Sequence, residues 1–408
     1  MKILIHGLNF SPELTGIGKF TGEMVQFLAK AGQHVRVVCA PPYYPDWKVH
    51  SGFSGTRFQQ FDRCGATVFR CPLYVPQKPS GITRIAHLAS FAVSSLPVVL
   101  WQALTWRPHI ILTIKPPIFC APQALLAARL SGARAWMHIQ DFELDAGFSL
   151  LGIGRSKGLR DLIGHAERLL LNRFHRVSTI SPAMMRGLIA KGVPTNRQVY
   201  FPNWVDLQAI RPWFGHNPWK QRLGLTDGIT VALYSGNLGT KQGIEIITEA
   251  ARLLVDSPIQ FVICGEGAGK AQLLRLAEGL PNILFLPLQP VEELNFLLNL
   301  GDIHLLPQRS EAESLVMPSK LTGIMAAGKP VIATLRPDSD LAHLIGNAGI
   351  ITPPGDAKAF SNAIIELARD PQRRLSMGHA ARTLAEREFN KDEILARFLD
   401  ELQRLCKD

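Results

Sequence analysis

Short apolar runs alternate with longer segments of helical periodicity along the chain, and this alternation is typical of βαβ units. In the first half, a helix is predicted at 19–30, and it ends before Gly32. Strands are predicted at 2–5, 34–39, 66–70, 110–114, 133–139 and 177–180. Because helix-length segments separate these strands, the sheet should be parallel, with right-handed crossovers.

The alternation breaks between 199 and 220, in a stretch rich in Pro, Trp and Asn, and then resumes. The second series has a helix at 244–254 and strands at 230–234, 260–264, 283–286, 303–306 and 331–334. We therefore predict an α/β protein with a first domain at 1–200, a second at 201–381, and a C-terminal helix at 382–408 that crosses back. Ligands of such folds bind at the carboxyl ends of the strands, so the two domains should face each other across a cleft.

Composition excludes some classes of function and favours others. With 408 residues, of which 47% are hydrophobic, the chain is too apolar to be disordered and too long for one core. The formal charge of +11 favours acidic partners such as nucleotides, nucleic acid or anionic lipid. A nucleic-acid-binding protein is a remote alternative, because the cations are spread out and no recognised module is present. The opening residues are too short for a signal-peptide core, so we expect a cytosolic protein.

Two segments look like the halves of one phosphate-binding site. The first runs over 235–243 and the second over 318–330, and each follows a predicted strand and opens a predicted helix. Helix starts direct unpaired N–H groups and a positive dipole end at an anion. Lys241 and Lys320 add one point charge each, so the expected ligand is phosphorylated.

A glycine loop joins the first strand to the first helix. It lacks the spacing of a Walker A loop, because Glu13 stands at the first glycine position and Phe20 follows the lysine. The dinucleotide fingerprint also fails, since Thr21 replaces its last glycine. We interpret Gly16 and Gly18 as allowing close backbone approach to a phosphate or sugar, and a plain tight turn is the alternative.

His138 and Asp141 stand at the end of a predicted first-domain strand, where side chains should reach the cleft. They could orient sugar hydroxyls or move a proton, with Asp141 the stronger candidate. The alternative is that His138 is a packed strand residue. The pair Asp338 and Asp340 has a metal-like spacing, but nothing nearby completes a ligand shell, so no metal is expected.

The segment 82–105 is apolar nearly all round, with a narrow polar stripe of Arg84, His87, Ser94 and Gln102. That stripe and Pro97 argue against a spanning helix. A core helix is one interpretation, and a helix lying in the plane of an anionic membrane surface is the one we prefer. The cations expected to support docking are Lys78, Arg84, Arg107 and Lys115.

Taken in order, several motifs resemble those of the GT-B glycosyltransferases of family 4, over essentially the whole chain. They are Gly16-Ile-Gly18, Asn203-Trp-Val-Asp206, the 235–243 loop, Gly265-Glu-Gly267 and Ala326-Ala-Gly-Lys-Pro-Val331. More narrowly, Tyr43-Tyr-Pro45, His138-Ile-Gln-Asp141 and Pro318-Ser-Lys-Leu321 resemble the colanic-acid type exopolysaccharide transferases, which are regarded as fucosyltransferases.

The resemblance implies a retaining, metal-independent glycosyltransferase whose co-substrate is a nucleotide sugar, with GDP-fucose suspected, and which has no separate cofactor. The expected acceptor is a lipid-linked exopolysaccharide precursor, and the expected location is the cytoplasmic, inner face of the membrane. Expected catalytic residues are His138, Asp141 and Glu313, and expected donor-binding residues are Gly16, Gly18, Gly236, Asn237, Lys241, Leu288, Ser319 and Lys320. A sugar-nucleotide epimerase on the same architecture is the alternative enzyme.

This sequence departs from the family pattern at three positions. Asn237 replaces the usual arginine of the first phosphate motif, so Lys320 or Arg309 would have to supply that charge. Gly323 stands where the second of two glutamates is expected. Gln140 stands where many relatives have a histidine, and strand alternation puts His138 on the same face as a stand-in.

Overall fold

The computed structural model describes residues 1–13, 16–78, 80–115, 118–142, 157–239, 242–309 and 319–407, with only the backbone described at 157, 159–161 and 319. The chain forms two compact units. The first comprises Met1–Pro202 together with Glu393–Asp408, and the second comprises Asn203–Asp392. Each unit contains one sheet, and each is described by itself below.

The sheet of the first unit has eight strands in the order β3-β4-β2-β1-β5-β6-β7-β8. Their bounds are β1 Lys2–Gly7, β2 His34–Cys39, β3 Gln59–Arg63, β4 Ala66–Arg70, β5 Ile110–Lys115, β6 Arg134–Ile139, β7 Arg176–Thr179 and β8 Gln198–Tyr200. All neighbouring strands pair in parallel except β3 and β4.

The prediction of a wholly parallel sheet is therefore wrong at this edge. A two-residue turn joins β3 to β4, and both its residues, Cys64 (φ 55°) and Gly65 (φ 75°), have positive φ. Positive φ at both central positions produces a tight hairpin whose twist matches antiparallel strands. Strand β3 was not predicted from the sequence, because Gln59–Arg63 is mostly polar and exposed and so has no apolar pattern.

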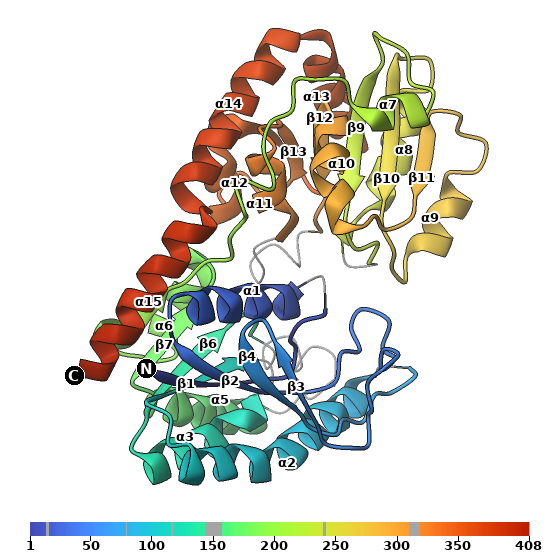
Figure 1. Ribbon diagram of the computed structural model, residues 1–408. Coiled ribbons are helices and arrows are strands. Elements are labelled where there is room, and N and C mark those ends of the chain that lie inside the picture. The colour runs from blue at the N-terminus through green and yellow to red at the C-terminus, as the bar shows by residue number, and fades with distance from the viewer. Residues whose placement is uncertain are drawn as a thin grey trace. The chain divides into compact units, whose positions relative to one another are not determined.

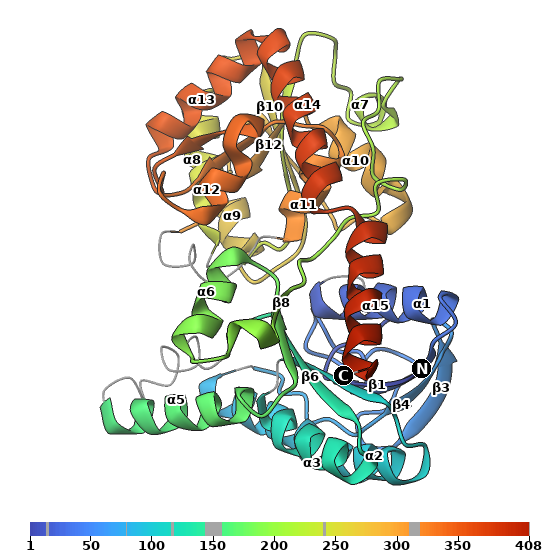
Figure 2. The ribbon, with the colours of Figure 1, turned by 90° about the vertical axis from the view of Figure 1, so that its left-hand side faces the viewer.

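Helices cover both faces of this sheet. Figures 1 and 2 show α1 and α15 on one face, with α2 and α3 on the other. Helix α1 begins at Gly16, three residues before the predicted 19. The helical bounds are α1 Gly16–Lys30, α2 Gly81–Thr105, η1 Ile118–Cys120, α3 Ala121–Ser131, α5 Lys157–Leu171, α6 Pro182–Ala190, η3 Thr195–Arg197 and α15 Lys391–Lys407.

Helix α2 packs on the unit through both apolar and polar side chains, and its buried apolar residues are Phe91, Ala92, Val99 and Ala103. Ser95 lies 3.0 Å from Nε2 of His6 on β1, and the side chain of Gln102 accepts a 2.7 Å bond from Arg36 on β2. His87 is also buried, with Nδ1 2.6 Å from the carbonyl oxygen of Tyr74. The large apolar residues of α2 that are exposed are Ile82, Ile85, Val93, Leu96, Trp101 and Leu104. Two residues of the predicted polar stripe, His87 and Gln102, thus belong to the buried face.

The six strands of the second unit are all parallel, in the order β11-β10-β9-β12-β13-β14. The order reverses between β9 and β12, as in the Rossmann fold. The strands are β9 Thr230–Ser235, β10 Ile259–Cys264, β11 Ile283–Leu286, β12 Ile303–Leu306, β13 Val331–Thr334 and β14 Gly349–Thr352. The helices are α7 Pro218–Arg222, α8 Glu245–Leu253, α9 Lys270–Leu276, η5 Val291–Glu293, α10 Leu294–Leu300, α11 Ser319–Ala326, α12 Asp340–Ile345, η7 Gly346–Ala348, α13 Ala357–Arg369 and α14 Pro371–Glu388.

Apolar side chains fill both faces of the second sheet. On one face, α8 and α13 pack with Phe261 and Phe360 in a cluster that includes Tyr234. On the other face, α11 and α14 bury Leu321, Met325 and neighbouring residues against β12 and β13. Both faces of the central strands are therefore covered, as is usual for parallel sheets.

The C-terminal helix predicted at 382–408 is wrong, because this part of the chain belongs to two helices. Helix α14 ends at Glu388 and α15 begins at Lys391, and between them Phe389 accepts a backbone bond from Val205. Within the first unit, α15 docks through Phe398, whose ring stacks on Phe201 at 4.1 Å and meets Trp136 edge-on at 5.1 Å. These rings attach the C-terminal helix to β6 and to the residue that follows β8.

We predict that Phe398→Ala loosens α15 from the first unit. Truncating a buried phenylalanine typically costs about 3–5 kcal/mol, and here the lost contacts are those that hold one helix. Hydrogen exchange measured by mass spectrometry should become faster across 393–407, while α8 in the second unit, which has no part in this packing, is the internal control. Unchanged protection of α15 would show that other contacts hold it.

Candidate functional site

The two predicted phosphate loops belong to the two strands that flank the reversal of strand order. The first loop follows β9, and the second segment contains α11, the helix that comes after β12 in the chain. These strands pair directly, with Ile303 beside Ala232 and His304 beside Leu233. Their carboxyl ends are consequently neighbours, at the place where ligands bind in open α/β sheets.

Lys320, in the first turn of α11, reaches across to the first loop. Its Nζ atom donates to Tyr234 Oη at 2.8 Å and to Gln242 Oε1 at 2.7 Å, and lies 4.1 Å from the centre of the tyrosine ring. A Cβ atom placed on Gly236 would lie 3.4 Å from Cε of Lys320. Burial lowers the pKa of Lys320 to about 7. The structure thus brings Gly236 and Lys320 together.

Of the other residues predicted for this donor site, the structure describes some fully and others only in part or not at all. Asn237 follows Gly236, and its backbone oxygen accepts a 2.7 Å bond from Tyr234. Lys241 and Glu313 lie outside the described residues, and only the backbone of Ser319 is described.

A second glycine turn, Gly265-Glu-Gly267, lies next to the first loop and is joined to it by backbone hydrogen bonds. Backbone bonds run from Gly236 N to Cys264 O and from Leu238 N to Glu266 O. A Cβ atom on Gly267 would lie 2.5 Å from Oδ1 of Asn237, so only glycine fits there. The Gly265-Glu-Gly267 turn therefore has a structural task, which is to hold the first loop in place.

Leu288, predicted to lie near a nucleotide base, is 50% exposed just after β11. The adjacent strand end is tied to the glycine turn by a bond from Gly265 N to Leu286 O. An exposed leucine next to this turn offers an apolar surface to a planar ring. Its role stays a prediction.

A concavity of about 330 Å³ opens beside the first loop in the second unit. Its lining includes Gly243, Gln308, Arg309 and Thr334. Arg309, one of the two cations considered as a replacement for the missing arginine, forms an ion pair with Glu245 at the start of α8. Lys320 is consequently the better placed of the two, because no described carboxylate forms an ion pair with it.

In the first unit, a carboxylate occupies the start of α1. Glu13 accepts bonds from the backbone N–H groups of Tyr43 and Tyr44, each at 3.2 Å, and a Cβ atom on Gly18 would lie 2.5 Å from its Oε2. Gly16 has a φ of 60°, which favours glycine. Burial raises the pKa of Glu13, against the lowering effect of its hydrogen bonds. Both glycines thus have structural reasons, which favours the tight-turn alternative for this loop.

His138 is buried in a hydrogen-bonded row on the first sheet. Its Nδ1 lies 2.9 Å from Ser178 Oγ and its Nε2 lies 2.9 Å from Gln140 Nε2, and Phe201 packs on the ring. Burial lowers the pKa of His138 to about 3, so the ring is neutral at physiological pH. His138 and Gln140 share a face of the sheet, as strand alternation predicted. Asp141 follows half-buried after β6.

Lys115 does not serve as a surface cation, and its predicted part in membrane docking is wrong. It ends β5 fully buried and donates to Glu167 on α5 at 2.7 Å, and Lys191 contacts the same carboxylate. Burial alone would raise the pKa of Glu167, but the two ammonium groups outweigh it and the pKa is lowered. The error arose because a lone lysine at a strand end gives no sign of a partner 52 residues away.

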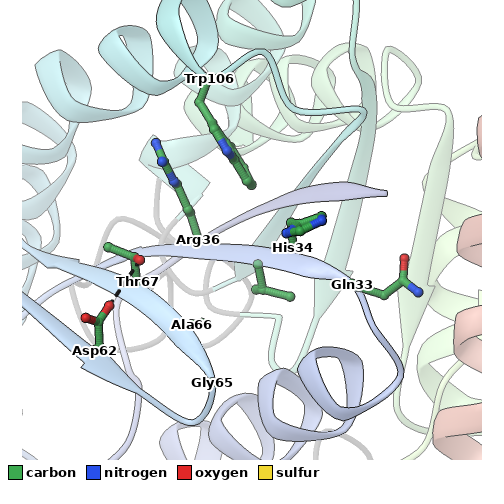
Figure 3. A pocket seen from close by; sticks show the side chains of 9 residues that line it. Gln33, His34, Arg36, Asp62, Gly65, Ala66, Thr67 and Trp106 are labelled. Atoms are coloured by element: carbon green, nitrogen blue, oxygen red, sulfur yellow. Dashed lines mark hydrogen bonds between the residues drawn. The ribbon is translucent and has the colours of Figure 1, made fainter.

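Another concavity of the first unit, of about 360 Å³, lies towards the amino ends of β2 and β4 (Figure 3). Arg36 stacks on Trp106 there, 4.6 Å from the ring centre, and Thr67 donates to Asp62 across the β3–β4 pair. None of the predicted site residues lines it. Across the described ranges, no group of three or more His, Cys, Asp or Glu side chains could hold a metal ion.

Comparison with known families divides the chain much as the fold does. Residues 15–204 match the model of the glycosyl transferase 4-like domain, and residues 216–384 match the model of glycosyl transferases group 1. A protein of Escherichia coli K12 named as a colanic acid biosynthesis glycosyl transferase, WcaI, is 42% identical over 99% of this chain and 100% of its own length.

Solved structures share the fold. Sucrose-phosphate synthase from Thermosynechococcus elongatus superposes with a TM-score of 0.76 at 16% identity, covering 99% of this chain and 98% of that one. HepE of Anabaena in complex with UDP-glucose superposes with a TM-score of 0.69 at 16% identity, covering 99% and 100%. With the two matched domains and the full-length relative, these findings show that the chain belongs to the GT-B glycosyltransferases of family 4 and is a glycosyltransferase.

Proposed function

We propose that this glycosyltransferase takes its sugar from a nucleoside diphosphate donor bound by the second unit, with retention at the anomeric carbon and without a metal. The observation that carries the proposal is the position of Lys320 against Gly236, at the reversal of strand order. The donor class is also supported by HepE, a protein of the same fold that was solved with UDP-glucose.

Charge develops on the diphosphate as the glycosidic bond breaks. The first loop and the start of α11 would surround that charge with backbone N–H groups, the Lys320 ammonium and, as we propose, Lys241. Preorganised donors of this kind are typically worth several kcal/mol in the transition state, because they need no reorganisation when charge appears. Cationic side chains would therefore do what a metal ion does in other enzymes.

The catalytic assignment rests on fewer contacts. Asp141, Glu313 and His138 remain the proposed catalytic residues, and the burial of His138 leaves Asp141 the better candidate for contact with the sugar. Because both ring nitrogens of His138 lie within hydrogen-bond distance of other side chains, its contribution would be to hold Gln140 rather than to carry a proton.

We further propose a lipid-linked exopolysaccharide precursor as acceptor, reached from the inner face of the membrane. Helix α2 is long and apolar enough to cross a bilayer by length and composition. Spanning would strip Ser95 and Gln102 of their partners in the first unit, whereas lying in the plane keeps those bonds and covers the outward residues. Val93 is 74% exposed and Ile82 is 77% exposed, so apolar surface is present for lipid.

Basic side chains lie near both ends of α2, whose exposed apolar residues would contact the membrane. Lys78 and Arg84 lie near the start of α2 and Arg107 lies just past its end, and all three are exposed. Basic residues near an anionic membrane each contribute roughly 1 kcal/mol of attraction. The first unit therefore combines apolar area with matching charge.

The donor prediction is that GDP-fucose stabilises the protein against thermal unfolding more than UDP- or ADP-sugars do. A ligand at about 100 times its Kd adds roughly 2.7 kcal/mol, enough to raise the unfolding temperature by several degrees. Product analysis then separates the two enzyme classes, since transfer releases a nucleoside diphosphate and consumes acceptor, whereas epimerisation yields an isomerised sugar nucleotide. Stabilisation by another donor, and not by GDP-fucose, would overturn the fucose assignment.

Lys241→Ala is predicted to lower turnover roughly tenfold or more, because it removes a charge that we propose to stabilise the leaving group. Steady-state assays with saturating donor would measure the change. Lys358→Ala, which removes an exposed lysine of α13 in the same unit, is the matched control and should turn over normally. Wild-type turnover in Lys241→Ala would reject the proposed role.

The purified protein is predicted to bind anionic vesicles at low salt and to dissociate as salt rises, because the attraction is partly electrostatic. Val93→Glu should weaken vesicle binding roughly tenfold, because it removes one exposed apolar side chain that would be buried in the membrane surface on docking. The matched control is Leu375→Glu on α14, which replaces an exposed leucine of the second unit. Absence of vesicle binding by the unaltered protein would end the membrane proposal.

A further inference from the structure

The Lys320 amine is held by two neutral oxygens rather than by a carboxylate. An ammonium group has three N–H donors, and the hydroxyl of Tyr234 and the amide oxygen of Gln242 account for two of them. The third donor has no further hydrogen bond to a described residue. A carboxylate partner would have cancelled the charge, whereas neutral acceptors fix the direction of the amine and leave its charge available.

Tyr234 links three parts of the site. It is fully buried at the end of β9, and its hydroxyl lies 2.7 Å from Asn237 O and 2.8 Å from Gln242 Oε1, besides accepting from Lys320. The Tyr234 hydroxyl therefore contacts Asn237 and Gln242, which lie towards the two ends of the first loop, and also the ammonium group of Lys320. Its ring also faces the ammonium, which adds a cation–π contact.

We propose that Tyr234 and Gln242 are positioning residues, which hold the Lys320 ammonium so that its remaining N–H donor is directed at the diphosphate of the donor. This inference rests on the proposed function of the same site. The two residues act through Lys320 and need not touch the ligand. They would align the charge before the donor arrives, so little freedom is lost on binding.

Donor binding should consequently depend on pH. Burial lowers the pKa of Lys320 to about 7, so the amine is charged below that pH and loses its proton as the pH rises through it. Affinity for a diphosphate should be highest on the acid side and fall above neutrality. Burial raises the pKa of the Tyr234 phenol, which therefore stays neutral, and the nearby Glu245 and Arg309 pair with each other.

The decisive experiment compares Tyr234→Phe with Lys320→Met and the double variant. Removing one hydrogen bond to a charged group should lower kcat/KM for the donor roughly tenfold at pH 7. It should also shift the falling, alkaline limb of the pH profile to lower pH, because the charged amine has lost an acceptor. In the Lys320→Met background, Tyr234→Phe should have no further effect.

Equal losses from Tyr234→Phe in both backgrounds, or an unmoved alkaline limb, would show that the tyrosine only fills space and would overturn the proposal. Tyr74→Phe, at a half-exposed tyrosine of the first unit, is the control and should match the unaltered enzyme. If Tyr234→Phe fails to fold, as judged by circular dichroism, Gln242→Leu removes the other acceptor and should give the same acid shift.

Binding of inorganic pyrophosphate, measured by calorimetry at pH 6 and pH 8, separates this inference from the proposed function. Tighter binding at pH 6 that Tyr234→Phe weakens would uphold the positioning role even if no sugar nucleotide were turned over. The opposite result is turnover of a sugar nucleotide with pyrophosphate binding that changes neither with pH nor in Tyr234→Phe. That result would uphold the transferase function and overturn the positioning role.

Discussion

The parallel pairing of β9 with β12 is the constraint on which the proposed site depends. These strands are neighbours in the sheet although more than sixty residues separate them, and the strand order reverses between them. Lys320 on α11, the helix that comes after β12, therefore lies against the end of β9 and the loop that follows it. The contact of Lys320 with Tyr234 is the local result, since it joins α11 to the end of β9. A lysine buried there without an ion-pair partner among the described residues suits a site that binds an anion.

The first unit repeats the architecture but uses it differently. Close to the start of α1, Gly18 packs against the protein's own carboxylate, Glu13, which accepts bonds from the backbone of Tyr43 and Tyr44. The carboxyl end of β5 is likewise occupied, by the buried pair of Lys115 and Glu167. Breaking such a pair usually costs several kcal/mol, because the remaining charge would be buried alone. These internal charges favour a division of tasks in which the second unit binds the diphosphate.

Helix α2 buries polar as well as apolar side chains and leaves other large apolar side chains exposed. Ser95 and Gln102 have polar partners on β1 and β2, in His6 and Arg36, and apolar residues such as Phe91 are buried with them, while Val93 is exposed. A soluble protein rarely exposes a contiguous apolar surface without a use for it. The same arrangement explains why the helix can be apolar by composition yet firmly attached to a globular unit.

Local patterning determined most of the secondary structure. The strands at 34–39, 66–70, 283–286, 303–306 and 331–334 have the predicted bounds, because β-branched and other apolar residues predominate in each run and glycine, proline or polar residues lie close to its ends. The two segments predicted to bind phosphate carry a local signal, glycine and lysine at strand-to-helix junctions, and the structure brings Gly236 and Lys320 of these segments together. The polar edge strand β3 was not, because its pairing is set by a turn rather than by apolar residues.

Tertiary structure alone decided which polar side chains are buried and what they contact. His138 and Lys115 were expected to be accessible, and nothing was predicted of the burial of Glu13, yet each is buried against partners 30 to 52 residues away. The sequence of one strand end carries no record of the neighbouring strand, and pKa values depend on that neighbour. Likewise, the amine of Lys320 acquired its orientation only when β9 and β12 came together, because Tyr234 lies 86 residues before it in the chain.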